Sequence, residues 1–105
     1  MLEAIKKFFG ITTIDYKQLM QEGAIILDVR MPGEFSSGHI PKSINIPVDR
    51  LANNLNKLKN KATPVITCCA SGMRSATAKR ILLSKGYANV YNGGSWNSLY
   101  NKIKA

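Results

Sequence analysis

The chain has 105 residues, of which 45% are hydrophobic and 20% are charged. That length suits one domain over residues 1–105 with its own core, and that composition excludes an intrinsically disordered protein. Fifteen Lys and Arg residues against six Asp and Glu give a net charge of +9. The positive charges are scattered, and their densest run, Lys57, Lys59 and Lys61, has no aromatic residues interleaved as stacking platforms. We therefore expect a surface that attracts small anions, and no nucleic-acid binding.

The first part of the chain predicts helix, strand and helix. Apolar positions 2, 5, 8 and 9 fall on one face of a helix over residues 1–10. Ile11–Thr13 is typical of a short first strand. Asp15 is a helix-capping residue, and we expect the helix that it caps to end before Gly23.

The middle of the chain predicts two strands separated by an irregular stretch. Ala24–Val29 is the apolar run of a buried strand. Residues 30–42 contain several Pro and Gly breakers and have room for one turn of helix near Glu34. Ser43–Ile46 is a short strand, and Asp49 is expected to cap a helix after it. The buried face of that helix would comprise Leu51, Leu55 and Leu58.

The last third of the chain contains two strands and two helices. We expect a strand over Val65–Cys68, a helix over Arg74–Lys85 and a strand over Ala88–Tyr91. Asn92–Gly94 is expected to be a turn, and a final helix begins at Ser95. This alternation predicts an α/β domain with a mainly parallel sheet. Because the carboxyl ends of parallel strands gather at one edge, the loops after the strands should meet there.

The segment after the third expected strand joins a cysteine to a loop of small residues that ends in Arg74. The backbone N–H groups of such a loop can converge on one point, because Ala70, Ser71 and Gly72 leave the concavity uncrowded. The N-terminus of the next helix and the arginine would face the same point. A cysteine thiolate would be stabilised there, so the loop predicts a cysteine nucleophile. The alternative, in which the two cysteines are inert core side chains, stays open here.

Cysteine and histidine usage limits the other kinds of chemistry. Cys68 and Cys69 are neighbours and cannot form an ordinary disulfide framework, so we expect reduced thiols and a cytoplasmic location. Together with His39, the single histidine, they lack the number and spacing of zinc ligands, so we expect no metal and no cofactor. No stretch approaches the roughly 18 apolar residues of a membrane span. We expect a monomer without membrane association.

Three motifs resemble the signatures of rhodanese-like domains. The first comprises Asp28-Val29-Arg30, Pro32, Glu34-Phe35, Gly38-His39-Ile40-Pro41, Ser43 and Asn45-Ile46-Pro47. The second is Cys69-Ala70-Ser71-Gly72-Met73-Arg74-Ser75, and the third is Gly93-Gly94 followed by a tryptophan. They occur in the expected order between residues 28 and 96, so the chain is similar to single-domain rhodaneses.

The resemblance implies a three-layer α/β fold with a five-stranded, mainly parallel sheet flanked by helices. It also implies a thiosulfate sulfurtransferase. A small anionic donor would give a sulfur to Cys69, and a thiol or cyanide would accept it from the resulting persulfide; a protein acceptor is also open. The substrate-binding loop would comprise Ala70, Ser71, Gly72, Met73, Arg74 and Ser75. The supporting residues would be Asp28, Arg30 and Glu34.

Two of these side chains have alternative roles. Arg74 could bind the anionic donor, or it could form a structural ion pair with Asp28 or Glu34, which we favour. Arg30 has the same two roles. For His39, a structural hydrogen bond is favoured over a role as general base, because amides and the helix dipole can already activate the thiol.

The two adjacent cysteines leave open which of them begins the loop that ends at Arg74. Counting from Cys69 to Arg74 gives four intervening residues, the loop of sulfurtransferase rhodaneses, whereas counting from Cys68 gives the longer loop of related phosphatases and arsenate reductases. The second motif favours Cys69, and Thr67 stands where the phosphatases usually have histidine. Cys68 is then expected to pack inward. A persulfide carrier or a binding module for a partner protein is the other alternative.

Overall fold

Four parallel strands form the centre of the computed structural model, which describes residues 13–104. The strands are β1 (Ile25–Asp28), β2 (Ile44–Asn45), β3 (Val65–Cys69) and β4 (Val90–Ser95). They lie in the order β2-β1-β3-β4, and each neighbouring pair is parallel. The sheet therefore has four strands among the described residues and not the five expected. The helix expected over residues 1–10 lies outside the described residues. Of the strand expected over residues 11–13, only Thr13 is described, and it belongs to no strand.

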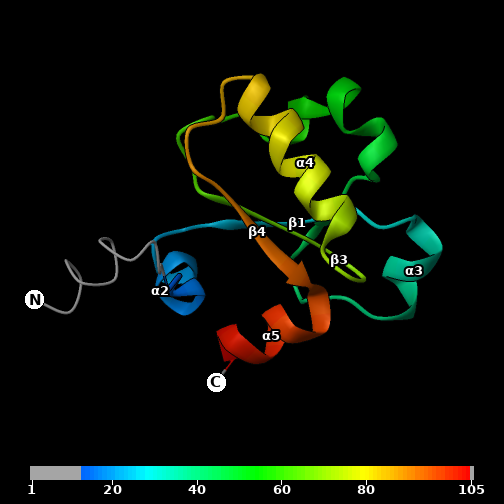
Figure 1. Cartoon of the computed structure of the whole chain (residues 1–105), viewed down its shortest axis with the longest axis vertical. Helices are drawn as coiled ribbons and strands as arrows, with labels where there is room; N and C mark the ends of the chain where they lie inside the picture. Colours follow the sequence, from blue (N-terminus) through cyan, green and yellow to red (C-terminus); the bar gives the residue numbers. More distant parts are fainter. Residues whose placement is uncertain (1–12, 105) are drawn as a thin grey trace, which may run out of the picture.

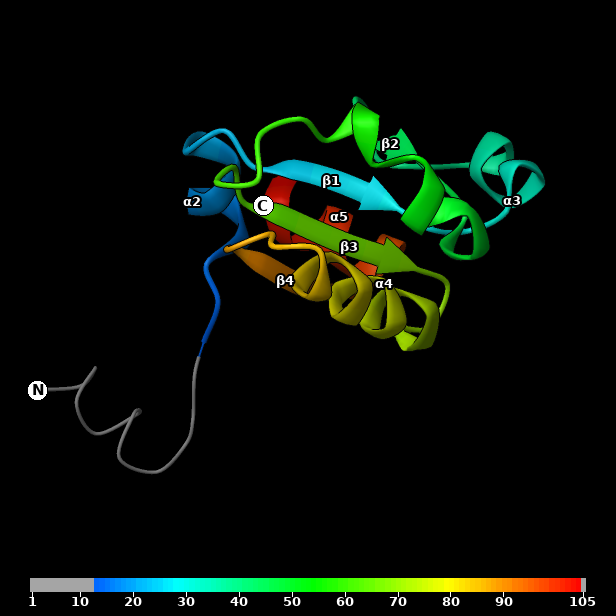
Figure 2. The same cartoon turned by 90° about the horizontal axis from the view of Figure 1, so that it is seen from above.

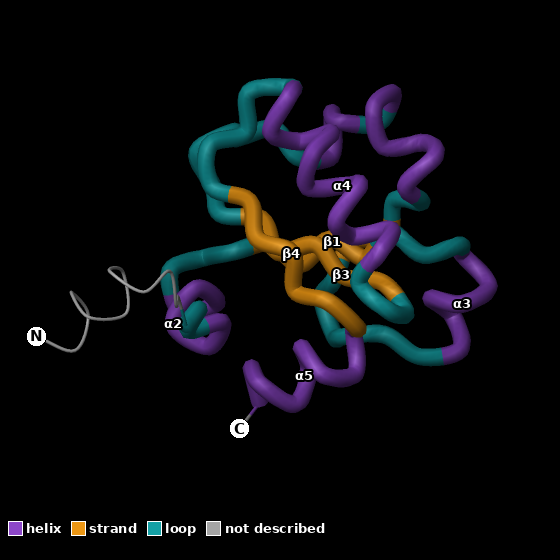
Figure 3. Tube along the Cα trace, in the orientation of Figure 1, coloured by secondary structure: helices purple, strands orange, loops and turns teal. Residues whose placement is uncertain are grey.

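Helices cover both faces of this sheet (Figure 1). The α-helices are α2 (Tyr16–Gln21), α3 (Pro32–Ser37), α4 (Met73–Ser84) and α5 (Trp96–Lys104). Two 3₁₀ helices, η1 (Val48–Asn53) and η2 (Leu55–Lys57), precede β3. Helix α4 lies over one face, α2 and α5 lie over the other, and α3 lies beyond the carboxyl ends of β1 and β3 (Figure 2, Figure 3).

The core is divided into two apolar clusters, one on each face. Successive strand residues point to opposite faces, so each strand contributes to both clusters. The cluster under α4 includes Leu27, Val65, Cys69, Leu51, Leu58, Ala78 and Leu82. The cluster under α5 includes Ala24, Ile26, Ile66, Cys68 and Leu99. Because both faces are covered, every residue of β3 is buried.

The helix expected after Asp49 is the clearest error among the predicted elements. Residues 48–57 form the two 3₁₀ helices, and Pro47 precedes the first of them without a side-chain cap. The Asn54 amide donates to the backbone carbonyl of Arg50 at 2.8 Å, and the backbone of Asn54 departs from helical geometry. This side-chain bond competes with a continuous helix, although Leu51 and Leu58 still reach the core.

The expected Gly-Gly turn is part of β4. A Cβ atom on Gly93 would lie 2.9 Å from side-chain atoms of Ile66 and Leu99 and from the carbonyl oxygen of Thr67. Glycine at this position therefore lets β4 lie directly against β3 and α5. Gly94 has φ of +80° and lies where the β3–β4 register shifts. The strand consequently continues to Ser95 before α5 begins.

Helix α3 is longer than the single turn expected. Pro32 occupies its first residue, a position where the missing N–H costs nothing. The Glu34 carboxylate accepts a hydrogen bond from the Met31 N–H at 3.0 Å, so it caps the start of its own helix. Glu34 is thus in the first turn of α3, which lies beyond the carboxyl ends of β1 and β3 (Figure 2).

Candidate active site

Cys69 is the last residue of β3, and the loop that follows folds back over its sulfur. The Gly72 N–H donates to Sγ at 2.9 Å, and the Ser75 N–H donates at 3.4 Å. The Ser75 Oγ also lies 3.4 Å from Sγ. Burial by itself would raise the pKa of the Cys69 thiol, since the residue has no exposed surface. The Ser75 hydroxyl and the N–H groups of Ser75, Gly72 and Ser71 outweigh burial, and the pKa is lowered.

The backbone of the loop forms this cradle. Gly72 has φ of +99°, in the left-handed region that favours glycine, and it directly precedes α4. A Cβ atom there would lie 3.4 Å from the Cα of Gly94. Ala70, Ser71 and Met73 are exposed, so the groups that contact the sulfur are backbone amides and Ser75. The cradle therefore favours an anionic sulfur without a charged side chain in contact with it.

Arg74 forms a two-pronged ion pair with Glu34. Its Nη1 and Nη2 atoms lie 2.7 and 3.0 Å from the two carboxylate oxygens. The hydrogen bonds from Arg74, followed by the bond from the Met31 N–H, lower the pKa of Glu34 to about 2. Of the two roles open to Arg74, the structure contains the ion pair, and its partner is Glu34 and not Asp28. The pair ties α4 to α3 beside the loop.

Arg30 forms a second ion pair, which is buried. Its Nη2 atom lies 2.7 Å from the Asp28 carboxylate and 2.7 Å from the Gly38 carbonyl oxygen. The guanidinium also lies over the Trp96 ring, 4.9 Å from its centroid. The hydrogen bond with Asp28 raises the pKa of Arg30. The guanidinium thus fixes the chain between β1 and β2, which agrees with a supporting role.

Cys68 points to the other face of the sheet. It has no exposed surface and lies in the cluster that contains Ile66 and Leu99. Burial, followed by the nearby charge of Asp28, raises the pKa of the Cys68 thiol to about 12. A thiol in this environment stays protonated and out of reach of substrates. The expected inward packing of Cys68 is confirmed.

His39 makes local contacts at the end of α3. Its Nδ1 atom lies 2.7 Å from the carbonyl oxygen of Phe35, and its ring stacks on the Phe35 ring with 3.7 Å between centroids. These contacts agree with the structural role favoured from the sequence.

Asn92 is a site residue that sequence reasoning missed. Its Nδ2 donates to the Gly72 carbonyl oxygen at 3.2 Å. Its Oδ1 accepts from the Ser75 hydroxyl at 2.6 Å and from the Gly94 N–H at 3.0 Å. The sequence contained one usable signal, a polar residue at the carboxyl end of a strand next to the cysteine loop. The two glycines that follow Asn92 are typical of a turn, so the sequence predicts a turn at this residue.

The comparison with protein families agrees with this arrangement. The family model described as the rhodanese-like domain matches residues 12–102. The chain belongs to the rhodanese-like family. That match contains all three motifs, including the loop from Cys69 to Ser75.

Several relatives of this rhodanese-like domain are sulfurtransferases by name. Thiosulfate sulfurtransferase GlpE of Pseudomonas syringae is 31% identical over 86 residues, which cover 78% of this chain and 80% of that protein. A rhodanese domain-containing protein of Drosophila melanogaster is 41% identical over 91 residues, which cover 73% and 82%. The first of these relatives supports a sulfurtransferase function at the level of the family, and the second supports membership of the rhodanese-like family.

Solved structures of rhodaneses share the fold. A human single-domain sulfurtransferase superposes with a TM-score of 0.71 at 27% identity, and the match covers 82% of this chain and 89% of that one. A rhodanese with anions from Escherichia coli superposes with a TM-score of 0.69 at 30% identity, covering 72% and 91%. The α/β fold with a parallel sheet flanked by helices is therefore that of the rhodaneses.

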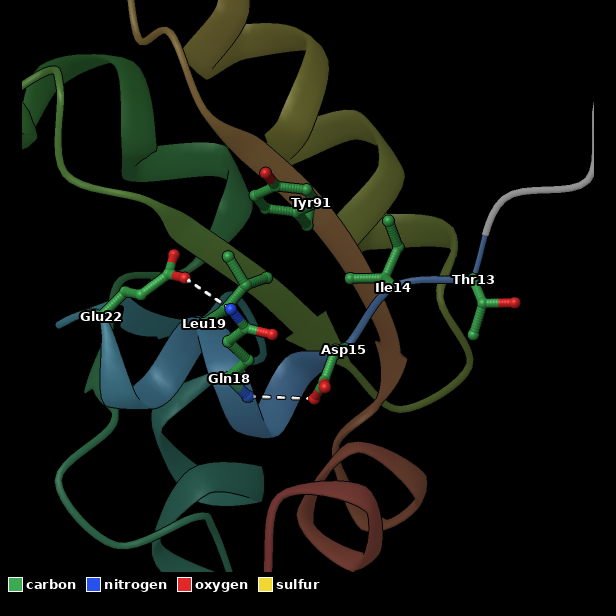
Figure 4. A pocket seen from close by; sticks show the side chains of 7 residues that line it. All are labelled: Thr13, Ile14, Asp15, Gln18, Leu19, Glu22 and Tyr91. Carbon is green, nitrogen blue, oxygen red and sulfur yellow. Dashed lines mark hydrogen bonds between the residues drawn. The ribbon is translucent and has the colours of Figure 1, made fainter. Parts of the chain in front are cut away.

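This rhodanese-like domain also has a cavity of about 200 Å³ beside α2, with none of the cysteine-loop residues in its lining (Figure 4). Two of its acidic residues are bonded to Gln18. The Asp15 carboxylate accepts from the Gln18 N–H at 3.0 Å, and Glu22 accepts from the Gln18 side-chain amide at 3.2 Å. The complete lining comprises Thr13, Ile14, Asp15, Gln18, Leu19, Glu22 and Tyr91. With neither cysteine nor histidine among them, this cavity has no nucleophile of that kind.

Neither a group of metal ligands nor a membrane-crossing helix is found within residues 13–104. In this part of the chain, no three His, Cys, Asp or Glu side chains are placed to hold a metal ion. None of the helices described here combines the length and the apolar character that crossing a membrane requires.

Proposed function

We propose that this protein is a thiosulfate sulfurtransferase that carries sulfur as a persulfide on Cys69. The observation that supports this proposal is the position of the Cys69 sulfur, which receives hydrogen bonds from the N–H groups of Gly72 and Ser75 and has a lowered pKa. A nucleophilic thiolate and a concentrated set of donors around it are the two requirements of sulfur transfer.

In the first step, the Cys69 thiolate attacks the outer sulfur of thiosulfate. A sulfur–sulfur bond forms at Cys69 while the sulfur–sulfur bond of thiosulfate breaks, and sulfite leaves with the electron pair. The loop N–H groups and the N-terminus of the 12-residue helix α4 stabilise the negative charge on the outer persulfide sulfur. Because Cys69 has no exposed surface, the loop has to shift as the donor approaches.

In the second step, an acceptor attacks the outer sulfur of the persulfide. Cyanide forms a carbon–sulfur bond and leaves as thiocyanate, while a thiolate acceptor leaves as a new persulfide. In both cases the bond to Cys69 breaks and the electron pair returns to its sulfur. The enzyme is thus regenerated as a thiolate, which the same N–H groups stabilise.

The remaining loop residues have assigned roles in this proposal. The backbone amides from Ala70 to Ser75 bind the transferred sulfur, and Arg74 holds the loop through Glu34. Asp28 and Arg30 hold the chain behind it. We do not propose a phosphatase or arsenate reductase that uses Cys68, because that thiol is buried on the other face with a pKa of about 12.

A protein acceptor is the second candidate, and exposed methionines favour it. Met31 and Met73 are 45% and 79% exposed. Glu34 links the two segments that carry them, because its carboxylate accepts the Met31 N–H and pairs with Arg74, the neighbour of Met73. Flexible methionines suit surfaces that bind protein partners. In this variant of the proposal, the same Cys69 persulfide is delivered to a thiol of a docked protein.

Mass spectrometry of the intact protein tests the proposal. After incubation with thiosulfate, we expect an added mass of one sulfur atom that disappears on treatment with cyanide. Cys69→Ser should lose the adduct and lower the transfer rate by about a thousandfold or more, whereas Cys68→Ser should retain both within a few-fold. An adduct that depends on Cys68 and survives Cys69→Ser would contradict the assignment of the nucleophile.

A further inference from the structure

The Ser75 hydroxyl lies between two groups that compete for its single hydrogen. Its Oγ is 2.6 Å from the Oδ1 of Asn92 and 3.4 Å from the Sγ of Cys69. Ser75 is fully buried, so no exposed water layer replaces either contact. The direction in which this O–H points therefore decides whether the sulfur receives a hydrogen bond or provides one.

The side-chain amide of Asn92 has one consistent orientation. Its nitrogen faces the Gly72 carbonyl, which can only accept, and its oxygen faces the Gly94 N–H, which can only donate. The oxygen is therefore also the atom that faces Ser75. Since an amide oxygen cannot donate, the Ser75 hydroxyl donates to Asn92 and leaves a lone pair for the S–H group of Cys69.

This arrangement fits the neutral thiol and has to change for the thiolate. When Cys69 loses its proton to solvent, the sulfur can only accept. The Ser75 hydroxyl then turns about its Cβ–Oγ bond to donate to the sulfur, and the Asn92 oxygen retains the hydrogen bond from the Gly94 N–H. The thiolate thus gains one donor at the expense of the short Ser75–Asn92 bond.

We propose that Asn92 is a positioning residue that acts through Ser75, holding the hydroxyl hydrogen away from Cys69 until the sulfur becomes an anion. This inference deepens the proposed function and rests on Cys69 being the reacting cysteine. Asn92 has a second contact in the site, to the Gly72 carbonyl. That carbonyl also accepts the Ala76 N–H at 3.1 Å, so it keeps a partner when Asn92 is replaced.

The charged groups around Cys69 are already paired and leave the Ser75 contact as the adjustable one. Arg74 on α4 is paired with Glu34 on α3, and Asp28 at the end of β1 is paired with Arg30. Among the described side chains of β4 near the cysteine, the polar group that reaches Ser75 is the neutral amide of Asn92.

The decisive experiment is the pH profile of Cys69 alkylation by iodoacetamide, with the modified peptide identified by mass. Asn92→Leu removes the competing acceptor in a side chain of similar size. We expect the apparent pKa of Cys69 to fall by about half to one unit, because the hydroxyl then donates to the thiolate without losing another bond. In a Ser75→Ala background, Asn92→Leu should cause no such fall.

A purely structural role gives the opposite sign. If Asn92 only holds the loop in place, its loss weakens the N–H contacts of Gly72 and the pKa of Cys69 rises. A rise, or a shift of the same size in both backgrounds, overturns the proposal. The matched control is Asn89→Leu, whose amide donates to the Ala62 carbonyl at the far end of the strand and which should leave the profile unchanged. A fall as large in that control would also overturn it.

Asn92→Asp keeps the proposal testable if the leucine variant does not fold. The carboxylate accepts the Ser75 hydroxyl more strongly, so the pKa of Cys69 should rise, and by more with Ser75 present than with alanine at that position. Equal rises overturn the proposal. Alkylation does not require sulfur transfer, so this readout stays valid even if thiosulfate gives no persulfide and the proposed function fails.

Discussion

Cys68 and Cys69 are neighbours in the chain, but β3 turns their side chains to opposite faces of the sheet. Under α4, the Cys69 sulfur meets the N–H groups of the loop, and its pKa is lowered. Under α5, Cys68 lies in an apolar cluster, and burial, followed by the charge of Asp28, outweighs the charge of Arg30 and raises its pKa to about 12. Both thiols are buried, so burial does not distinguish them. The hydrogen-bond donors around the Cys69 sulfur distinguish the two thiols.

The two ion pairs of the site repeat this contrast. Asp28 and Arg30 lie on the Cys68 side, where their side chains are 0% and 5% exposed. Glu34 and Arg74 lie beside the Cys69 loop, where the side chains are 39% and 36% exposed. The buried pair holds the framework and the half-exposed pair holds the loop, so we expect different penalties when each is broken.

The largest expected effect separates the two thiols directly. Burial raises the pKa of the Cys68 thiol to about 12, so its thiolate fraction at neutral pH is about a thousandfold below that of an ordinary cysteine. We therefore expect iodoacetamide to modify Cys69 in the Cys68→Ser variant at least about a thousandfold faster than Cys68 in the Cys69→Ser variant. Peptide mass mapping over time measures both rates.

Unfolding provides the control for that comparison. In concentrated urea, both single-cysteine variants should react at similar rates, because neither thiol then has its folded surroundings. Similar rates in the native state would mean that the two faces of β3 do not differ as described.

The raised pKa of Cys68 also predicts a pH dependence. Its contribution to stability is present below pH 9.0 and is lost as pH rises through about 12.

The next effect is on stability and concerns the buried pair. Asp28→Asn leaves the Arg30 guanidinium, which is 4% exposed as a residue, without its counter-charge. We expect the free energy of unfolding to fall by about 3–5 kcal/mol, measured by urea denaturation. Asp49→Asn is the matched control, because Asp49 is exposed and its change should cost little. A loss for Asp28→Asn no larger than for this control would show that the pair does not hold the framework.

The smallest effect concerns the half-exposed pair. Glu34→Gln removes the charge that binds Arg74, and we expect a melting temperature lower by a few degrees at most, together with a several-fold lower transfer rate from a looser loop. Because the pKa of Glu34 is lowered to about 2, its contribution is present above the usual value of 4.5 and is lost as pH falls through about 2. The stabilities of wild type and variant should therefore converge at the acid end.

Thermal melts at several pH values, together with assays of the transfer rate, check this prediction against Glu22→Gln. Glu22 is also an exposed carboxylate with a hydrogen bond, to Gln18, but it is far from the loop in the chain. That control should have full transfer activity. If it loses as much activity as Glu34→Gln, the Arg74 contact has no special part in holding the loop.

Part of this site was predictable from the sequence because local patterns carry it. The apolar run before Cys69 predicted a buried strand, and the small residues before Arg74 predicted a loop that opens a helix. The inward packing of Cys68 was predicted because, with Cys69 as the nucleophile, Cys68 falls at the end of the expected strand. Asn92 was not predictable in the same way, because its partners, Gly72 and Ser75, are 20 and 17 residues away in the chain.

The errors have a similar physical origin. Residues 48–57 had the leucine spacing of an α-helix, but the Asn54 side-chain amide donates to the Arg50 carbonyl oxygen and competes with a continuous helix. The two glycines of β4 have the composition of a turn, yet Gly93 serves a close contact with Ile66 and Leu99. Composition and periodicity indicate the structure that a segment favours by itself. The structures of these two segments depend instead on a side-chain hydrogen bond and on packing against other elements.

The sequence by itself determined the alternation of strands and helices, the position of the reactive loop and the family to which the chain belongs, because each depends on residues close together in the chain. Tertiary structure decided which cysteine meets the loop amides, which carboxylate pairs with Arg74 and where the Ser75 hydroxyl points. Those outcomes depend on β1, β3, β4 and α3 meeting at one edge of the sheet. At that edge, Arg74 comes within hydrogen-bonding distance of Glu34, and Ser75 comes within hydrogen-bonding distance of Asn92.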